Sequence, residues 1–300
     1  MLLNAFIDQG IKALEPLYPT GEARQLILML CEETLGIKSY THIVNPEYEL
    51  SSADTSMLLS KLEELSKGKP IQYVLGYADF CGFRFKVSPA VLIPRPETEL
   101  LVRDALQQAS RIKRMRAAYG KSAEPVRVLD LCTGSGCIAW SVALSLPGTQ
   151  VVGTDISEEA LQVARSQDFA AELKERQATA PVFVRSDVLD TGQEFPYGPF
   201  DVILSNPPYI LPSEKSLMRV NVLDYEPEGA LFVPQEDPML YYRAIARWSV
   251  RLLSPEGKAL TEINAQLAKE TQDVFRSAGF TGIEVIKDYF YKNRFVLYYR

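Results

Sequence analysis

Along the first 75 residues, apolar positions recur at intervals of three and four, the spacing of one face of a helix. Two such sets are Ala23-Leu26-Ile27-Leu30 and Met57-Leu58-Leu62-Leu65. Ser51 precedes the second set as a candidate N-cap, and Gly68 followed by Pro70 marks its end. No strand-like alternation of apolar and polar residues occurs before residue 77. We therefore predict a small helical domain over residues 1–76.

The pattern changes at residue 77, where aromatic and β-branched residues surround a turn at Gly82. This pattern predicts a β-hairpin, and we assign residues 77–95 to a linker between two domains. Pro96 then opens a long helix that runs to about Tyr119, with acidic residues in its first turn. Its far end carries the basic residues Arg111, Lys113, Arg114, Arg116 and Lys121. A solvated helix face explains this cluster, although RNA or an acidic partner would also fit.

From residue 126 onward, short apolar runs typical of strands alternate with helical stretches. Strands are predicted at 126–131, 150–155, 182–185, 200–205 and 257–263, and helices at about 137–146, 157–175, 238–253 and 265–278. Two further strands, 283–288 and 294–299, end the chain without a helix between them. Repeated β-α units indicate a largely parallel sheet with helices on both faces. The fold class is therefore α/β, with a Rossmann-like domain over residues 96–300 and an antiparallel closing pair.

Composition excludes several classes of protein. The chain is 47% apolar and 23% charged, as in ordinary globular proteins, and its apolar runs are too short to cross a bilayer. Its first residues lack the basic and apolar regions of a signal peptide. Four cysteines and one histidine make neither a disulfide framework nor a metal-ligand set. We therefore expect a reduced, cytoplasmic protein without a metal or a membrane partner.

The charge balance gives no sign of stable nucleic-acid binding. The net charge is −6, and the first 75 residues carry six basic against ten acidic side chains. Proteins that hold a nucleic-acid backbone show a basic surface, because neutralising phosphates supplies much of their affinity. The single histidine, His42, lies in the helical segment and argues against a histidine-based catalytic triad.

A glycine-rich turn follows the first strand of the predicted sheet. The segment Asp130–Gly136 reads Asp-Leu-Cys-Thr-Gly-Ser-Gly and leads into a helix, so its glycines allow close approach to a nucleotide-like ligand. Asp155 ends the next strand, nineteen positions after Gly136, where a carboxylate can hold ribose hydroxyls. Asp187 follows the third strand at the same edge. An alanine replaces the third glycine of a dinucleotide site, which an S-adenosylmethionine site does not need.

A second turn, Asn206-Pro207-Pro208-Tyr209, ends the fourth strand. Two consecutive prolines cannot continue a strand ladder, so they fix a rigid extended turn. Such a turn can aim the side-chain oxygen of Asn206 and the carbonyl of Pro207 at one small group. The same residues would also serve as a plain strand terminator. Their place beside a glycine-rich turn and an acidic strand end favours a functional role.

With both turns in place, the chain resembles the release-factor glutamine methyltransferases of the PrmC/HemK type over nearly its whole length. The most specific blocks are Pro70–Gly76, Leu92–Glu99, Asp130–Gly136 and Asn206–Tyr209. The resemblance implies a seven-stranded methyltransferase domain behind a helical domain, with S-adenosyl-L-methionine as cofactor and S-adenosyl-L-homocysteine as product. It implies methylation of the glutamine side-chain amide in the Gly-Gly-Gln motif of class 1 peptide chain release factors, in support of translation termination.

The resemblance also assigns residue roles. Asn206, Pro207 and Tyr209 would be catalytic, and Pro208 and Glu97 would complete the substrate pocket. The cofactor would contact Thr133, Gly134, Gly136, Asp155, Asp187, Asn206, Arg95 and Thr98. Tyr209 would lie on the substrate amide, unless it is a core aromatic. For Arg95, Glu97 and Thr98 the alternative is an ordinary helix start.

Three positions depart from the family pattern. Cys132 and Asn264 stand where glycine is usual, and residues 231–239 replace a glycine-rich segment. The last change concerns a segment over residues 210–235, which we expect to form a lid or docking loop at the mouth of the site. The paired glycines are intact, so we expect cofactor binding to be retained.

Other readings of the two turns stay open. An adenine-specific DNA methyltransferase would use a similar turn, but it usually carries a basic recognition domain, whereas the additional domain here is acidic. A ribosomal-protein glutamine methyltransferase and a non-catalytic binding module are further options. We expect a monomer whose residues 1–76 dock the release factor.

Overall fold

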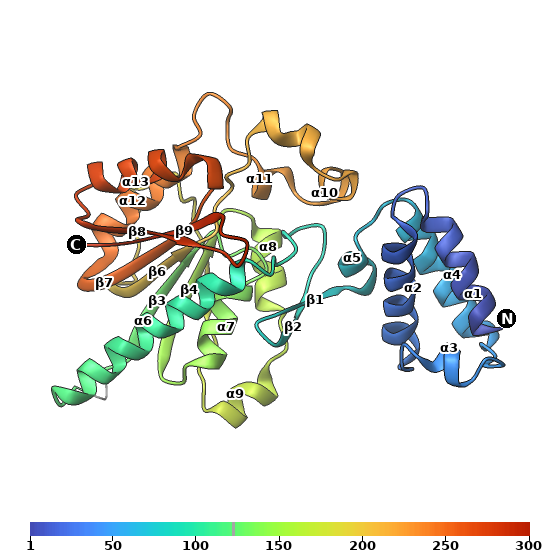
Figure 1. Cartoon of the computed structure of the whole chain (residues 1–300). Coiled ribbons are helices and arrows are strands. Elements are labelled where there is room, and N and C mark those ends of the chain that lie inside the picture. The colour runs from blue at the N-terminus through green and yellow to red at the C-terminus, as the bar shows by residue number, and fades with distance from the viewer. Residues whose placement is uncertain (122–123) are drawn as a thin grey trace. The chain divides into compact units, whose positions relative to one another are not determined.

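The computed structural model describes residues 1–121 and 124–300 and divides the chain into two compact units. The first unit comprises Met1–Tyr77 together with Met218–Tyr225, and the second comprises Ala78–Leu217 together with Glu226–Arg300 (Figure 1). A stretch of the segment expected to form a lid therefore belongs to the helical unit. No helix among the described residues is long and apolar enough to cross a membrane.

The first unit is helical, as predicted. Its helices are α1 (Leu3–Leu14), α2 (Thr20–Leu35), α3 (Thr41–Val44), α4 (Ser52–Ser66), α5 (Ile71–Leu75) and α10 (Val220–Tyr225). Ser51 is the N-cap of α4, and its hydroxyl accepts a hydrogen bond from the Asp54 N–H at 3.1 Å. A Cβ at Gly10 would lie 2.7 Å from the Ile27 side chain, so glycine allows α1 and α2 to pack closely.

Helix α10 is held to this unit by polar contacts although it lies far along the sequence. Arg219, just before α10, donates to Glu22 at 2.5 Å, and the Tyr225 hydroxyl at its end donates to the Lys67 carbonyl at 2.8 Å. These contacts join residues about 160 to 200 positions apart, which no local sequence pattern reveals.

The second unit is built on a seven-stranded sheet in the order β5-β4-β3-β6-β7-β9-β8. The strands are β3 (Val126–Leu131), β4 (Thr149–Asp155), β5 (Val182–Arg185), β6 (Phe200–Ser205), β7 (Leu253–Glu262), β8 (Gly282–Lys287) and β9 (Asn293–Tyr299). The first five are parallel, and β9 pairs antiparallel with both neighbours, which confirms the predicted fold class. Strand β7 begins four residues before the prediction, because an irregular register with β6 accommodates Pro255 and Gly257.

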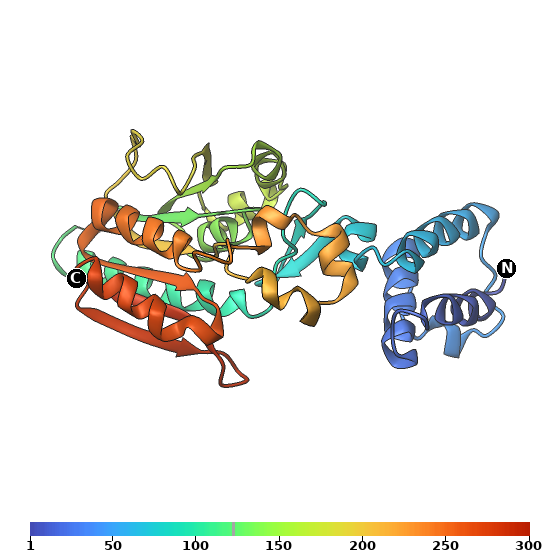
Figure 2. The ribbon, with the colours of Figure 1, turned by 90° about the horizontal axis from the view of Figure 1, so that it is seen from above.

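Helices cover both faces of this sheet (Figure 1). They are α6 (Thr98–Ala118), α7 (Cys137–Ser145), α8 (Glu158–Arg165), α12 (Leu240–Leu252) and α13 (Ala268–Ser277). The unit also contains the short helices α9 (Ala170–Arg176) and α11 (Glu228–Leu231). One core contains Val126 and Val128 of β3 with α6 and α7, and the other contains Leu129 and Leu131 with α12 and α13. Figure 2 shows the same unit from above. Because both faces of the sheet are buried, the turns at the ends of its strands are the parts left accessible to a ligand.

The single helix predicted at 157–175 is wrong, because the chain breaks between α8 and α9. Phe169 turns into the first core and is 4% exposed. Gln167 accepts from the Lys86 N–H at 2.8 Å and donates to the Ser135 carbonyl at 3.1 Å. These tertiary contacts outweigh the local helical pattern.

The predicted hairpin is formed by β1 (Tyr77–Phe80) and β2 (Phe83–Lys86). Its Phe80 and Phe85 side chains are 1% and 0% exposed within the first core of the sheet unit. Their rings lie 6.1 Å apart in an edge-to-face arrangement. The hairpin therefore contributes to the core of the larger unit.

Two residues of the basic cluster at the end of α6 make hydrogen bonds to neighbouring segments of the fold. Arg116 donates to the Asp201 carboxylate at 2.7 Å, where β6 begins, and to the Pro125 carbonyl at 2.7 Å. Lys113 donates to the Pro147 carbonyl at 2.6 Å. Arg111 and Arg114 are exposed, as expected for a solvated helix face.

We predict that Phe275→Ala destabilises the sheet unit strongly. Phe275 is fully buried, and its ring stacks on Tyr298 with centroids 3.8 Å apart. The loss in the free energy of unfolding should be about 3–5 kcal/mol. Urea unfolding followed by tryptophan fluorescence measures it, because Trp140 and Trp248 both lie in this unit. Phe290→Ala, at a position 76% exposed, is the matched control and should cost less than about 0.5 kcal/mol; equal losses would contradict the assigned core.

Candidate active site

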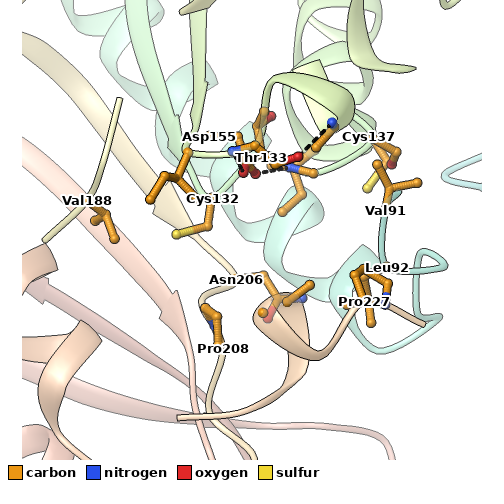
Figure 3. A pocket seen from close by; sticks show the side chains of 18 of the residues that line it. Val91, Leu92, Cys132, Thr133, Cys137, Asp155, Val188, Asn206, Pro208 and Pro227 are labelled. Carbon is orange, nitrogen blue, oxygen red and sulfur yellow. Dashed lines mark hydrogen bonds between the residues drawn. The ribbon is translucent and has the colours of Figure 1, made fainter. Parts of the chain in front are cut away.

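A cavity of about 250 Å³ opens at the carboxyl ends of the central parallel strands (Figure 3). It lies where the strand order reverses between β3 and β6, the position at which α/β sheets bind ligands. Figure 3 shows Asn206 and Pro208, after β6, across the cavity from the turn that follows β3. The cavity therefore occupies the sheet edge predicted from the two sequence motifs.

Eight of the predicted site residues line this cavity. They are Thr133, Gly134, Asp155, Asp187, Asn206, Pro208, Arg95 and Thr98. Pro207, Tyr209, Gly136 and Glu97 are not part of the lining. Further lining residues that the motifs did not single out include Ser186, Val188, Pro227, Ala230 and Tyr241.

The two glycines after β3 have different tasks. Gly134 has φ +54°, and a Cβ there would meet nothing within 4 Å, so its backbone borders open space. Gly136 has φ +78°, and a Cβ there would lie 2.9 Å from the Phe183 ring and 3.0 Å from the Ala164 Cβ. Gly136 thus allows close packing at the start of α7, whereas Gly134 leaves room for a ligand.

Asp155 connects the turn after β3 with the turn after β4. Its carboxylate accepts from the Gly134 N–H at 2.9 Å and from the Ser157 N–H at 3.0 Å. Burial raises the pKa of Asp155, and the backbone hydrogen bonds oppose that rise. Each carboxylate oxygen can accept a second hydrogen bond, so Asp155 remains able to hold ligand hydroxyls.

A second carboxylate, that of Asp130, stabilises the turn after β3 from the protein interior. Asp130 is fully buried and accepts from the Thr133 hydroxyl at 2.5 Å. Burial raises the pKa of Asp130 to about 7. Its other oxygen and the Ser186 hydroxyl, which lines the cavity, have no hydrogen-bond partner among the described residues. An unpaired buried hydroxyl in the lining is suited to a polar ligand.

The Asn206–Tyr209 turn is held by a chain of hydrogen bonds that ends on Glu262. The Asn206 amide nitrogen donates to the Thr98 hydroxyl at 3.4 Å, and that hydroxyl donates to Glu262 at 2.8 Å. The Tyr209 hydroxyl donates to the other Glu262 oxygen at 3.0 Å. Glu262 is 1% exposed at the end of β7.

The direction of this chain follows from the chemistry of its end. An ionised carboxylate can only accept hydrogen bonds, so Thr98 must donate its single hydroxyl proton to Glu262. Thr98 can then only accept from Asn206, which places the Asn206 amide nitrogen inward and leaves its oxygen free for a ligand. Burial raises the pKa of Glu262, while the hydrogen bonds from Thr98 and Tyr209 and the charge of Arg294 oppose that rise.

Tyr209, the last residue of the turn, is half-buried against the interior of the sheet unit. It packs against the second core of the sheet unit, and its hydroxyl contacts Glu262. Its carbonyl accepts from the Asn264 side chain at 3.3 Å, and Asn264 also donates to Glu214 at 2.9 Å. Asn264, one of the departures from the family pattern, therefore fixes the end of the Asn206–Tyr209 turn.

Glu226 organises the rim of the cavity. Its buried carboxylate accepts from Arg95 at 2.7 Å and from the Ile93 N–H at 3.2 Å. Arg95 lines the cavity, whereas Glu97 occupies the N-cap position of α6, as an ordinary helix start would. Glu226 directly follows the residues that belong to the helical unit.

The segment 210–235 is structured along its length. It contains a 3₁₀ helix (Pro212–Leu217), α10 and α11, and Ile210 forms a parallel bridge with Phe232. Pro227, Gly229 and Ala230 from its second half line the cavity. The part of the segment after α10 thus contributes to the wall of the cavity.

Burial disfavours the thiolate form of the cysteines. Cys132 lines the cavity in a left-handed backbone conformation with φ +62°, so it adopts the conformation for which glycine is usual. Burial raises the pKa of Cys132 and raises the pKa of Cys31 and Cys81 to about 12. No group of three potential metal ligands occurs among the described residues.

Sequence reasoning did not identify two buried carboxylates that orient residues of the site. Glu262 and Glu226 bind residues 164 and 131 positions away, so no motif spacing reveals them. The only local signal was their position, Glu262 at the end of a predicted strand and Glu226 before a proline.

Comparisons with known proteins cover both units. Two family models match: the PrmC N-terminal domain over residues 6–76 and the Methyltransferase small domain over residues 112–232. A Release factor glutamine methyltransferase of Bacteroides thetaiotaomicron is 38% identical over 97% of this chain and 97% of its own length. Proteins of the same name from Flavobacterium psychrophilum and Chlorobaculum tepidum are 34% and 36% identical, over 99% and 89% of this chain and 98% and 87% of their own lengths.

We predict that alanine mainly affects stability at Gly136 and mainly affects cofactor binding at Gly134. Both positions have positive φ, which costs about 1–2 kcal/mol for alanine. Gly136→Ala should lose about 1–3 kcal/mol more in the free energy of unfolding, because its Cβ would clash with Phe183 and Ala164. Gly134→Ala should instead weaken binding of S-adenosylmethionine, measured by calorimetry. Equal stabilities of the two variants, or unchanged affinity in Gly134→Ala, would contradict these tasks.

Proposed function

The chain belongs to the release factor glutamine methyltransferase family, and on that premise we propose that it methylates class 1 peptide chain release factors. The methyl group of S-adenosylmethionine would pass to the side-chain amide nitrogen of the glutamine in the Gly-Gly-Gln motif. The names of relatives aligned over both units favour a release factor over DNA or a ribosomal protein as the substrate.

The cavity fits S-adenosylmethionine by the chemistry of its donors and acceptors. Asp155 would accept hydrogen bonds from the ribose hydroxyls, and Asp187 with the unpartnered Ser186 hydroxyl would hold the adenine side. The open backbone at Gly134 leaves room for close approach. Arg95, fixed by Glu226, would face the methionine end. When bound, the cofactor supplies a methyl group activated by a sulfonium.

The turn after β6 would position the substrate amide. A carboxamide nitrogen is a poor nucleophile, because its electron pair is delocalised into the carbonyl. Its two N–H groups can donate to the Asn206 oxygen and the Pro207 carbonyl, which would fix the nitrogen and bias its electron pair out of the amide plane. Catalysis then rests on positioning and preorganised dipoles.

The proton balance needs no strong base. As the nitrogen formed its bond to the methyl carbon, the carbon–sulfur bond would break, and the methylated amide nitrogen would be strongly acidic. Water or a weak acceptor can take its proton. This agrees with a cavity lining that does not include the single histidine, His42.

The observation that carries this proposal is the orientation of the Asn206 amide. Glu262 and Thr98 hold the amide nitrogen of Asn206 inward, so its oxygen is presented as an acceptor before any substrate binds. A methyl acceptor with two N–H groups on one nitrogen is the ligand that such a turn suits. The proposed role of Pro207 rests on the same turn, although Pro207 is not part of the cavity lining.

The partner and location follow from the proposed reaction. We propose that the acidic helical unit docks the release factor and that the enzyme works as a cytoplasmic monomer, where translation terminates. No nucleic acid or membrane takes part in the reaction as proposed.

We predict that Asn206→Ala abolishes methyl transfer while cofactor binding is retained. Loss of one preorganised acceptor should lower kcat by about 100- to 1,000-fold. Mass spectrometry of the Gly-Gly-Gln peptide after reaction measures the gain of one methylene group, and calorimetry measures cofactor affinity. Duplex DNA is assayed in parallel. Methylation of adenine in the DNA would contradict the assignment. Simultaneous loss of methyl transfer and cofactor binding in the variant would also contradict it.

We predict that Glu262→Gln lowers kcat by up to about 100-fold. Glutamine can donate to Thr98, so the Asn206 amide would no longer be fixed in one orientation. In the native enzyme, kcat should fall as the pH drops toward the raised pKa of Glu262, because protonation has the same effect. The variant should lack that step. A native-like kcat or an identical pH profile in the variant would contradict the orienting role.

A further inference from the structure

Three consecutive aromatic side chains stand in solvent at the turn between β8 and β9. Tyr289, Phe290 and Tyr291 are 73%, 76% and 84% exposed, and we refer to them as the aromatic tip. Figure 2 shows the β8–β9 connection extending as a loop from the sheet unit. Soluble proteins rarely leave large apolar side chains clustered in this way unless they bind a partner.

The turn that presents the aromatic tip is rigidly built. The buried Asp288 carboxylate accepts from the Phe290 and Lys292 N–H groups at 2.9 and 3.0 Å and from Arg294 at 2.9 Å. Burial alone would raise the pKa of Asp288, but hydrogen bonds from Arg294 and the backbone lower it. Tyr291 has φ +61°, a strained conformation for a tyrosine. This arrangement holds the three rings outward.

The start of β9, next to the aromatic tip, is linked through Glu262 to the Asn206–Tyr209 turn. Glu262, which orients Asn206 through Thr98, pairs with Phe295 of β9. The Ile263 N–H donates to the Arg294 carbonyl at 2.9 Å, and Arg294 also pairs with Asp288. The aromatic tip therefore extends beyond the same sheet edge that carries Asn206. Phe290 lies in the turn between Lys287 at the end of β8 and Asn293 at the start of β9.

The surroundings of the aromatic tip are basic. Lys287 and Lys292 flank it and are exposed. Arg103 of α6 donates to the Tyr289 hydroxyl at 2.9 Å and lies 5.8 Å from its ring centre. Asp104 pairs with Arg103 at 3.6 Å, and Glu284 is exposed farther along β8. Apolar rings with a basic border fit a protein surface that combines apolar side chains with carboxylates.

We propose that the aromatic tip is a docking site for the release factor surface that borders its methyl-accepting loop. This inference rests on the proposed function. A glutamine that enters the cavity from a protein loop brings the flanking polypeptide across the sheet edge. The aromatic tip stands at that edge, and its basic border would complement carboxylates on the docked surface. It contributes to the affinity for the intact substrate and not to the chemical step.

The test is a triple variant, Tyr289→Ser, Phe290→Ser and Tyr291→Asn, which keeps Asp288 and places asparagine at the left-handed position. KM for an intact release factor should rise at least tenfold, while kcat at saturating substrate and the affinity for S-adenosylmethionine stay unchanged. Tyr119→Ser, at an 80% exposed tyrosine after α6, is the matched control and should change nothing. An unchanged KM, or a fall in kcat alone, would overturn the proposal.

A second measurement does not depend on tolerance of the triple substitution. A photoreactive phenylalanine analogue at position 290 should cross-link to the release factor, and unlabelled release factor should compete. Cross-links only to a second copy of the chain, to added RNA or to lipid vesicles would overturn the docking site. If the native enzyme leaves the release factor unmethylated, the proposed function itself fails, which is a separate result from an unchanged KM.

Discussion

The buried carboxylate of Glu262 is the constraint on which the arrangement of the site depends. Because an ionised carboxylate only accepts hydrogen bonds, it fixes the direction of the bond from Thr98 and, through it, the orientation of the Asn206 amide. The same carboxylate binds the Tyr209 hydroxyl at the other end of the turn. One group at the end of β7 thus sets both ends of a four-residue turn after β6. The prolines stiffen the turn, and Glu262 orients it.

The fold makes this possible by bringing strand ends together. Parallel pairing of β3 to β7 places the turns after β3, β4, β5 and β6 along one edge, and the reversal of strand order opens a cavity among them. Buried groups then fix each turn: Asp130 binds Thr133, Asp155 binds Gly134, and Glu226 binds Arg95. The resulting site is largely preformed, which suits chemistry that depends on positioning.

The sequence predicts much of this because many of the signals are local. Strand periodicity, Gly134, Gly136 and the two prolines each act within a few residues, and they placed the sheet and both turns correctly. The break between α8 and α9 was missed because distant contacts of Gln167 decide it. Glu262 and Glu226 were missed for the same reason, since Thr98 and Arg95, which they bind, lie more than a hundred positions away. Local patterns thus identify which turns carry chemistry, whereas the groups that orient them come from tertiary structure.

The most direct test of the account is a crystal structure of the enzyme with S-adenosylhomocysteine and a glutamine-containing substrate. The account predicts that the substrate amide nitrogen lies within hydrogen-bond distance of the Asn206 oxygen, with the Asn206 amide nitrogen still on Thr98 and Thr98 on Glu262. A complex in which the Asn206 nitrogen faces the substrate, or in which the turn points away from the sulfur, would contradict it.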